Sequence, residues 1–297
     1  MPSTHPTLIA VVGPVEPSLL AAWVRHYQHL GVERFLIAFY FPEHVTDRRR
    51  HELQATSREL GVIPTRTSTG PWHEHTNTQI RDSLRRTAGP GWHLLADADE
   101  FQQYHAPLTE VIAQAEKSGH RTVGGLMLDR VAAGGHLVDW PSDGGLDLAY
   151  PLGGHLTHRL LHGDPRKSVL VRHDVSVASG NHCAFGHQPD ADHICVVHHF
   201  KWHSGVLDDL RRRVQHFSTG TWQEQSPAVR SEASRLLAHV GQHNGVINVS
   251  DPRLAFRRVS LHRMPSTWPS EARGIVTAWR PYVYTDDGAH AVLSREG

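Results

Sequence analysis

Residues 93–104 read HLLADADEFQQY, and this stretch decides the fold assignment because an apolar run ends there in three acids. Asp97, Asp99 and Glu100 follow the run directly, and the aromatic residue Phe101 comes next. Acidic residues are poor strand formers, and they are costly to bury without a partner. The pattern therefore raises the question of what holds these carboxylates where a strand ends.

Apolar runs typical of strands alternate with amphipathic helical patterns around this stretch. The expected strands are residues 7–13, 33–41, 62–66, 92–97 and 122–131, and the expected helices are 16–31, 46–61, 76–89 and 107–119. This alternation predicts an α/β fold with a mostly parallel sheet flanked by helices. Ligands bind beyond the carboxyl ends of the strands in such sheets. The position of the acids therefore favours a binding site over a solvated turn.

The rest of the chain is less regular. Residues 132–190 are rich in Gly, Pro, Asp and His, which predicts long loops and short strands around a cleft. The run HICVVHHF, residues 193–200, predicts a further strand. Residues 205–217 and 226–241 predict two amphipathic helices, whose apolar stripes we expect to serve packing.

The composition sets limits on the class of protein. Hydrophobic residues make up 39% of the 297 residues, enough for a packed core. Lys and Arg number 30, as do Asp and Glu, so the neutral chain gives no electrostatic reason to expect nucleic acid or an anionic membrane as a partner. The two cysteines, Cys183 and Cys195, make neither a disulfide framework nor a zinc motif. Without a signal peptide or an apolar run of transmembrane length, we expect a soluble cytoplasmic protein.

The spacing of the first two acids indicates a metal. Asp97 and Asp99 are separated by one residue, so both carboxylates can reach one small volume, where they would repel each other without a cation. Mg²⁺ and Mn²⁺ favour oxygen ligands and typically take one or two protein carboxylates together with phosphate oxygens. A nucleoside diphosphate held at the end of a parallel sheet fits this chemistry.

The same residues carry a family resemblance. The form W…DxDEF, from Trp92 to Phe101, resembles the DxD motif of nucleotide-sugar glycosyltransferases with the GT-A fold, in their family 2-like and family 92-like members. Four more segments resemble these enzymes in the same order: EPSLLAAWVRHYQHLGVERFLIAF (16–39), GLMLDRVAAGGHL (125–137), RKSVLVRHDVSVASGNH (166–182) and VVHHFKWHS (196–204). The resemblance spans residues 7 to 215 and implies a GT-A-type, Rossmann-like α/β fold with C-terminal helices.

The resemblance implies a set of metal-site residues. Asp99 is the expected direct metal ligand, and Asp97 is expected to bind the metal, its water or the nucleotide ribose. His199 matches a C-terminal histidine that completes the metal shell, although a buried core histidine is the alternative. Its neighbour His198 must point to the opposite face of the strand, so only one of the pair is expected at the site. Glu100 is expected either to cap the next helix or to orient a neighbour.

Three further residues are candidates for binding substrate. Lys167 matches a lysine segment of the family, which implies diphosphate binding, and a surface lysine is the alternative. Glu16 either faces the nucleotide or is a first-turn acid of the following helix. His182 either lines the acceptor cleft or is an ordinary loop histidine.

The candidate general base is Asp129. It is expected to end the strand that follows the acidic motif, so its carboxylate should emerge at the same sheet edge as Asp97 and Asp99. The alternative is a salt bridge to Arg130 or another cation, and Asp139 and Asp143 compete for the catalytic role.

Together these features predict a glycosyltransferase that uses Mn²⁺ or Mg²⁺. It would move a sugar from a UDP-, GDP- or dTDP-linked donor to an unidentified acceptor hydroxyl or amine, and the family resemblance implies inversion. Residues 1–130 are expected to bind the donor, residues 131–205 to form the acceptor cleft and complete the metal site, and residues 206–297 to form a helical region packed on the same domain.

Two alternatives remain open at this point. A nucleotidyltransferase that makes sugar nucleotides also needs metal and phosphates, but VVGPVEPS, residues 11–18, lacks the basic, glycine-rich loop that such enzymes use. A non-catalytic protein that binds sugar nucleotides is the second alternative. The intact Asp-x-Asp motif and its supporting histidine argue against it.

Overall fold

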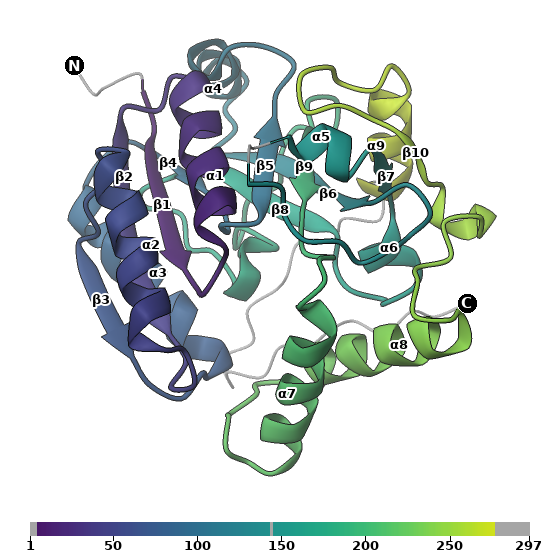
Figure 1. Cartoon of the computed structure of the whole chain (residues 1–297). Coiled ribbons are helices and arrows are strands. Elements are labelled where there is room, and N and C mark those ends of the chain that lie inside the picture. Colours follow the sequence, from purple (N-terminus) through teal and green to yellow (C-terminus); the bar gives the residue numbers. More distant parts are fainter. Residues whose placement is uncertain (1–4, 143–144, 277–297) are drawn as a thin grey trace.

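A computed structural model describes residues 5–142 and 145–276 and reveals a central β-sheet flanked by helices (Figure 1). The strands are β1 (Thr7–Val12), β2 (Arg34–Phe41), β3 (Arg66–Thr69), β4 (Trp92–Leu95), β5 (Glu100–Gln103), β6 (Thr122–Val131), β7 (Leu152–Gly154), β8 (Arg166–Arg172), β9 (Cys195–His199) and β10 (Arg257–Arg258). The helices are α1 (Pro17–His29), α2 (Asp47–Glu59), α3 (Glu74–Ala88), α4 (Leu108–Lys117), α5 (Leu146–Ala149), α6 (Leu156–Arg159), α7 (Val206–Ser218), α8 (Ala228–Gln242) and α9 (Trp268–Val276). Two 3₁₀ helices, η1 (Ser179–Asn181) and η2 (Pro252–Leu254), lie in the connections. The predicted α/β class is confirmed.

The alternation of side chains along β1 explains why helices cover both faces of the sheet. Leu8 and Val12 point into a core that includes the stripe of α1, with Trp23 and Tyr27 fully buried. Ile9 points the other way, into a core that includes residues of α3. Successive strand residues face opposite sides, so a strand that is apolar throughout needs cover on both.

The order of the strands locates the natural binding edge. The sheet runs β10-β7-β6-β8-β4-β1-β2-β3, and β1 pairs in parallel with both β2 and β4. The chain therefore moves from β1 to β2 and β3 on one side, and then returns to β4 on the other side of β1. This reversal is a topological switch point, where ligands of open α/β sheets bind beyond the carboxyl ends of the strands.

The second half of the sheet is mixed, which the sequence pattern did not predict. β8 runs antiparallel to both β4 and β6, and β9 pairs in parallel with β6 and antiparallel with β5. As a result β9, which comes late in the chain, lies beside the strand that follows the acidic motif. This pairing connects the two halves of the sequence.

Some predicted boundaries were wrong. The third strand was expected at 62–66, but β3 begins at Arg66. Pro64 cannot donate a ladder hydrogen bond, which explains the later start. The strand Glu100–Gln103 was not predicted at all, because it is only four residues long and contains a single apolar residue, Phe101.

The helices α7 and α8 pack together near the carboxyl end of β9 (Figure 1). Their shared core includes Trp202, Leu210 and Leu236, as the predicted apolar stripes suggested. Among the helices in the described part of the chain, none is long and apolar enough to span a membrane.

Candidate functional site

The acidic motif forms a tight turn between two strands, which answers the question that its sequence raises. The Glu100 backbone N–H donates to the Asp97 carbonyl oxygen at 3.0 Å, and the chain then enters β5. Phe101 is the one apolar residue of β5, is 1% exposed, and packs edge-on against Phe200 with ring centroids 5.1 Å apart. The Phe200 N–H donates to the Asp99 carbonyl oxygen at 2.8 Å. The turn is therefore fixed against the end of β9.

Lys167 is the cation that holds two of the three acids. Its Nζ lies 2.5 Å from Glu100 Oε1 and 3.2 Å from Asp97 Oδ2, and it donates to the Gly180 carbonyl oxygen at 2.8 Å. Strand register explains the pairing. Leu170 of β8 pairs with Leu94 of β4, so Lys167, three residues earlier, lies level with Asp97, three residues later.

All three N–H groups of the Lys167 ammonium have a partner, and its side chain is only 5% exposed. Burial raises the pKa of the Glu100 carboxyl above its usual range, and the Lys167 ammonium opposes this shift. Burial also acts to raise the pKa of Asp97, but Lys167 outweighs it and holds that pKa below its usual range. Asp97 remains 48% exposed, so one face of its carboxylate is open to a ligand.

The loop that supplies the Gly180 carbonyl is itself fixed by a buried arginine. Arg81 of α3 donates to the carbonyl oxygens of Ala178 and Val177, both at 2.7 Å, and to Asn181 Oδ1 at 2.9 Å. Gly180 has φ of +65°, a left-handed conformation that glycine adopts without strain. His182 follows this turn, and its Nδ1 lies 2.9 Å from the Arg166 carbonyl oxygen.

His199 connects the acidic motif to the strand β6. Its Nε2 lies 3.7 Å from Asp99 Oδ2, and its Nδ1 lies 3.0 Å from Asp129 Oδ1. In the sheet, His199 of β9 is paired with Glu100 on one side and with Asp129 on the other. His198 points to the opposite face, where it is fully buried against Arg130.

Asp129 is not at the end of its strand, and this decides its environment. β6 continues to Val131, so Asp129 is enclosed between β9 and β7 and is 1% exposed. Its Oδ2 accepts from the Thr157 N–H at 2.7 Å, and its Oδ1 accepts from the Thr157 hydroxyl at 2.7 Å and from Trp202 Nε1 at 2.9 Å.

With the contact to His199, Asp129 has four hydrogen-bond partners. Three of these four bonds end at Oδ1 and one at Oδ2, and the side chain is 1% exposed, so the carboxylate is held inside the sheet and out of reach of an acceptor. Burial acts to raise the pKa of Asp129, but the contacts with His199 and Thr157 together outweigh it and the pKa is lowered. Of the alternative partners for Asp129, Arg130 pairs with Asp147 at 2.7 Å instead, and His199 is the basic side chain that contacts Asp129.

The ionised Asp129 fixes the tautomer of His199. A carboxylate only accepts hydrogen bonds, so Nδ1 must carry the proton that lies between the two groups. In the neutral ring the Nε2 lone pair then faces the Asp99 carboxylate, and two acceptors that face each other are stabilised by a proton or a metal cation between them.

The other predicted residues lie around this centre or outside the described part. Glu16 is the N-cap residue of α1 at the carboxyl end of β1, and it forms an ion pair with Arg49 of α2. Asp139 accepts a hydrogen bond from Ser204 and is exposed. Asp143 lies outside the described residues.

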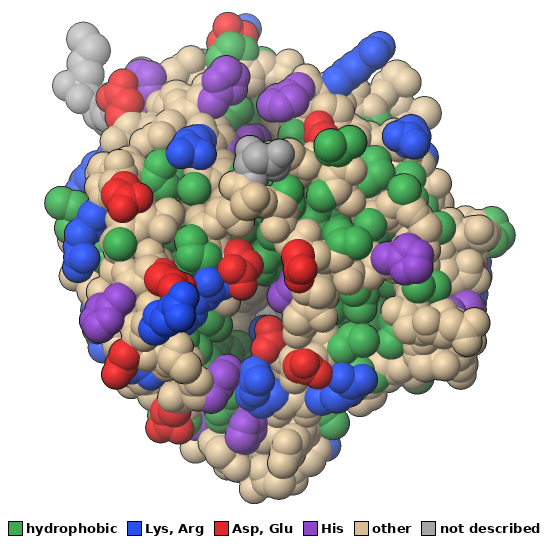
Figure 2. Space-filling model, in the orientation of Figure 1, with side chains coloured by type: hydrophobic (Ala, Val, Ile, Leu, Met, Phe, Trp, Pro, Cys, Tyr) green, Lys and Arg blue, Asp and Glu red, His purple; other side chains and the backbone are tan. Residues whose placement is uncertain are grey.

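A stacked aromatic pair adjoins the centre. The ring centroids of Trp140 and His203 are 3.9 Å apart, and Trp140 Nε1 donates to the Phe200 carbonyl oxygen. Burial lowers the pKa of His203, while the nearby carboxylates of Asp99 and Asp139, among others, oppose that shift. Figure 2 shows a hollow near the middle of the face in view, with acidic side chains around it.

Sequence reasoning missed two residues that hold Asp129. Thr157 is the second residue of the short helix α6, in a region without hydrophobic periodicity, so no pattern pointed to it. Trp202 lies in the segment VVHHFKWHS, but only the pairing of β9 with β6 brings its indole to Asp129. Both roles depend on contacts between distant segments.

The fit to a divalent cation depends on ligands from outside the chain. Within residues 5–142 and 145–276, no group of three or more His, Cys, Asp or Glu side chains could hold a metal alone. Asp99, in the turn before β5, and His199, at the end of β9, could supply two ligands, one oxygen and one nitrogen. Mg²⁺ and Mn²⁺ sites often complete such a partial set with phosphate oxygens and water.

Comparisons with known proteins give weak similarities only. No protein-family model and no curated protein matches the chain. The structure of S. aureus TarS 1-349 is 12% identical with a TM-score of 0.30, covering 83% of this chain and 77% of that one. The mannosyltransferase PcManGT from Pyrobaculum calidifontis, in complex with GDP-Man and Mn²⁺, is 13% identical with a TM-score of 0.35, covering 94% and 89%.

A UDP-glucose pyrophosphorylase complexed with UDP-glucose is 9% identical with a TM-score of 0.27, covering 78% of this chain and 88% of that one. At such low TM-scores, what these proteins bind or catalyse is not carried over to this chain.

The contacts of Lys167 generate a stability prediction. Lys167→Met leaves Glu100 and Asp97 without their cation, and removing one partner of a buried ion pair costs about 3–5 kcal/mol. Urea unfolding followed by circular dichroism measures the loss, and Lys167→Met/Glu100→Gln should recover part of it. The exposed Lys117→Met is the matched control and should stay within about 0.5 kcal/mol of the parent. An unchanged unfolding midpoint for Lys167→Met would contradict this structural role.

Proposed function

We propose that the protein is a metal-dependent glycosyltransferase that uses a nucleoside-diphosphate sugar. One observation carries the proposal: His199 Nε2 and the Asp99 carboxylate face each other at 3.7 Å, while Asp129 holds the other ring nitrogen. A carboxylate that orients a histidine is the usual support of a metal-binding imidazole. Mn²⁺ or Mg²⁺ is the proposed cation, because a mixed oxygen and nitrogen pair with room for phosphate suits these ions.

The position of this pair supports a nucleotide as the ligand. Asp97 and Asp99 follow β4, beside the switch point between β4 and β1. Residues 1–130 are the proposed donor-binding region, with Glu16 at the end of β1 on its rim. The half-exposed Asp97 is proposed to bind the ribose or a metal-bound water, and Lys167 acts indirectly by holding Asp97 in place.

Each residue of the site has its own proposed role in the reaction. The metal would neutralise charge on the departing diphosphate when it is bound. Asp99 and His199 hold it, and Asp129 keeps His199 in the tautomer that leaves Nε2 free. His182 is proposed to line the acceptor cleft. The acceptor hydroxyl or amine attacks the anomeric carbon from the face opposite the diphosphate, which inverts that centre.

Asp129 is replaced in this proposal as the general base, because four hydrogen bonds hold its carboxylate inside the sheet, where it is 1% exposed. We propose Asp139 instead. Its carboxylate is exposed and accepts a hydrogen bond from Ser204, and the next residue, Trp140, stacks on His203. A base must be able to reach the proton of the acceptor, and an exposed carboxylate at the rim of the site meets this condition.

The first functional prediction concerns Asp99. Asp99→Asn keeps the shape and removes the charge that binds the metal. Calorimetric titration with UDP and GDP in the presence of Mn²⁺ should give a loss of affinity of more than ~100-fold, because even groups that only orient a ligand change metal affinity by about 10–100-fold. Asp208→Asn, at a residue 78% exposed on α7, is the matched control. Equal Mn²⁺-dependent binding in folded Asp99→Asn would disprove the metal site.

The second prediction separates Asp129 from Asp139. In Asp129→Asn the amide places a donor against partners that all donate, so His199 loses its support, and the Mn²⁺ affinity should fall about 10–100-fold. In Asp139→Asn the Mn²⁺ and nucleotide affinities should persist, while hydrolysis or transfer of the donor sugar falls about 10²–10⁴-fold. The reverse pattern, with metal affinity intact in Asp129→Asn and turnover lost, would restore Asp129 as the base.

A further inference from the structure

A large groove lies apart from the metal site. Residues of α6, η2, β10 and α9 line it, and α6, β10 and α9 lie close together on one side of the molecule in Figure 1. Its volume is about 880 Å³, within the range of about 300–1,000 Å³ that is typical of small-molecule sites. The arginines Arg159, Arg253 and Arg257 and the acid Glu271 are among its lining residues, all of which are distinct from those assigned to the metal site.

The arginines of the groove carry more charge than the nearby acids offset. Arg253 pairs with Asp251 at 2.7 Å, and Arg257 pairs with Glu271 at 2.5 Å. The exposed side chain of Arg159 forms no ion pair or hydrogen bond with any residue that the structure describes. One positive charge is therefore left at the groove, which suits a ligand with an anionic group.

Arg257 also keeps donors for a ligand. Of the five N–H groups of a guanidinium, Arg257 uses one toward Glu271 Oε2 and one toward the Ala255 carbonyl oxygen at 3.5 Å. Its side chain is 29% exposed, so it stays accessible from the groove. A guanidinium fork matches the oxygens of a carboxylate or a phosphate.

His155 and Glu271 form a buried wall of the groove. His155 is the N-cap residue of α6, is 4% exposed, and has its Nε2 bonded to Glu271 Oε1. Burial acts to raise the pKa of Glu271, but the contacts with His155 and Arg257 together outweigh it and the pKa is lowered. The other ring nitrogen of His155, Nδ1, is buried and has no hydrogen-bond partner among the described residues. A buried polar atom of this kind is costly, so the wall is incomplete without a further polar group.

Groups that bind hydroxyls border the same groove. Thr267 directly precedes α9, Ser270 lies in its first turn, and both line the groove together with Glu271. Hydroxyl and carboxylate oxygens accept hydrogen bonds from the hydroxyls of a ligand. A volume of about 880 Å³ is also far larger than a single small ion needs. The lining therefore matches a hydroxyl-rich molecule with an acidic group better than a free anion.

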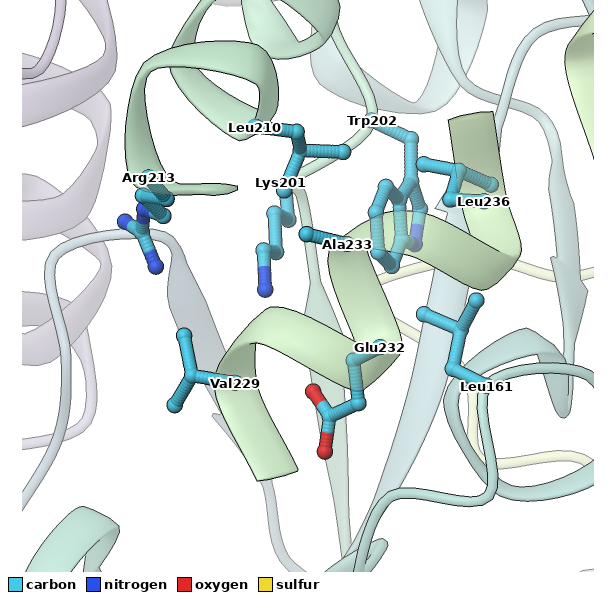
Figure 3. A pocket seen from close by; sticks show the side chains of 9 residues that line it. All are labelled: Leu161, Lys201, Trp202, Leu210, Arg213, Val229, Glu232, Ala233 and Leu236. Carbon is cyan, nitrogen blue, oxygen red and sulfur yellow. The ribbon is translucent and has the colours of Figure 1, made fainter. Parts of the chain in front are cut away.

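The space between α7 and α8 offers no comparable room. Lys201 and Arg213 surround it together with the carboxylate of Glu232, which supplies a negative charge from the chain itself (Figure 3). Its enclosed volume is about 10 Å³, enough for about one water molecule. The groove beside α9 is therefore the better place for a second ligand.

We propose that this groove is a second binding site, which holds an anionic saccharide, a sugar with a phosphate or carboxylate group. Arg159 and Arg257 bind the anionic group, and Thr267, Ser270 and Glu271 bind sugar hydroxyls. The inference goes beyond the proposed function and does not rest on it, because the groove and the metal site are built from different residues. Binding should therefore need neither Mn²⁺ nor a nucleotide.

The test uses glucose-6-phosphate and glucuronate, with glucose and inorganic phosphate as the separate parts, titrated into the full-length chain by calorimetry without metal. At least one anionic sugar should bind more tightly than glucose or phosphate, and the tighter of the two identifies the acidic group. A hydrogen bond to a charged group is strong enough that Arg159→Gln and Arg257→Gln should each weaken this binding about tenfold or more. Arg159→Lys keeps the charge and should retain more affinity than Arg159→Gln. Arg48→Gln, at an arginine 89% exposed on α2, is the matched control and should bind like the parent.

Other outcomes would overturn the inference. Equal affinity for the anionic sugar in Arg159→Gln and Arg257→Gln, with thermal unfolding like the parent, would exclude these residues, and a parent that binds neither anionic sugar would exclude the site. Phosphate that binds as tightly as glucose-6-phosphate would exclude a saccharide. Asp99→Asn should bind the anionic sugar like the parent, and a loss there would place the sugar at the metal site instead. Titration of the same preparation with UDP and Mn²⁺ reports separately on the proposed function.

Discussion

The arrangement of the site depends on one buried contact, the bond between Asp129 and His199. Asp129 is an ionised carboxylate inside the sheet, and it is tolerated there because four donors surround it. Because all of its partners donate, the imidazole must present a protonated Nδ1, and Nε2 is left for a ligand. The bond thus stabilises a buried charge and orients a potential metal ligand at the same time.

Strand topology brings these groups together from distant parts of the sequence. β9 pairs with β6 and β5, so His199 lies between Asp129 and the turn that carries Asp99. β8 lies between β4 and β6 and supplies Lys167 at the level of Asp97. The same ladders that form the core therefore fix the spacing of two carboxylates, a histidine and a cation, and side chains held by a rigid sheet are positioned with little entropy cost on binding.

The features that depend on local sequence patterns were predictable, and those that depend on contacts between distant segments were not. The α/β class, the strand before the acids and the opposite directions of His198 and His199 follow from local periodicity. The environment of Asp129 does not, because it depends on β6 extending to Val131 and on Thr157 reaching it from an unpatterned segment. The partners of Lys167 were not predicted for the same reason. No pattern in the sequence around residue 167 indicates that β8 pairs antiparallel with β4.

The central claim is that a divalent cation binds between Asp99 and Nε2 of His199. Pulsed electron paramagnetic resonance of Mn²⁺, in the presence of UDP or GDP, detects directly whether an imidazole nitrogen is coordinated. The parent chain should give nitrogen coupling, His199→Gln should lose it, and His203→Gln, at the other histidine near Asp99, should keep it. A parent spectrum without nitrogen coupling, or coupling that persists in His199→Gln, would contradict the account.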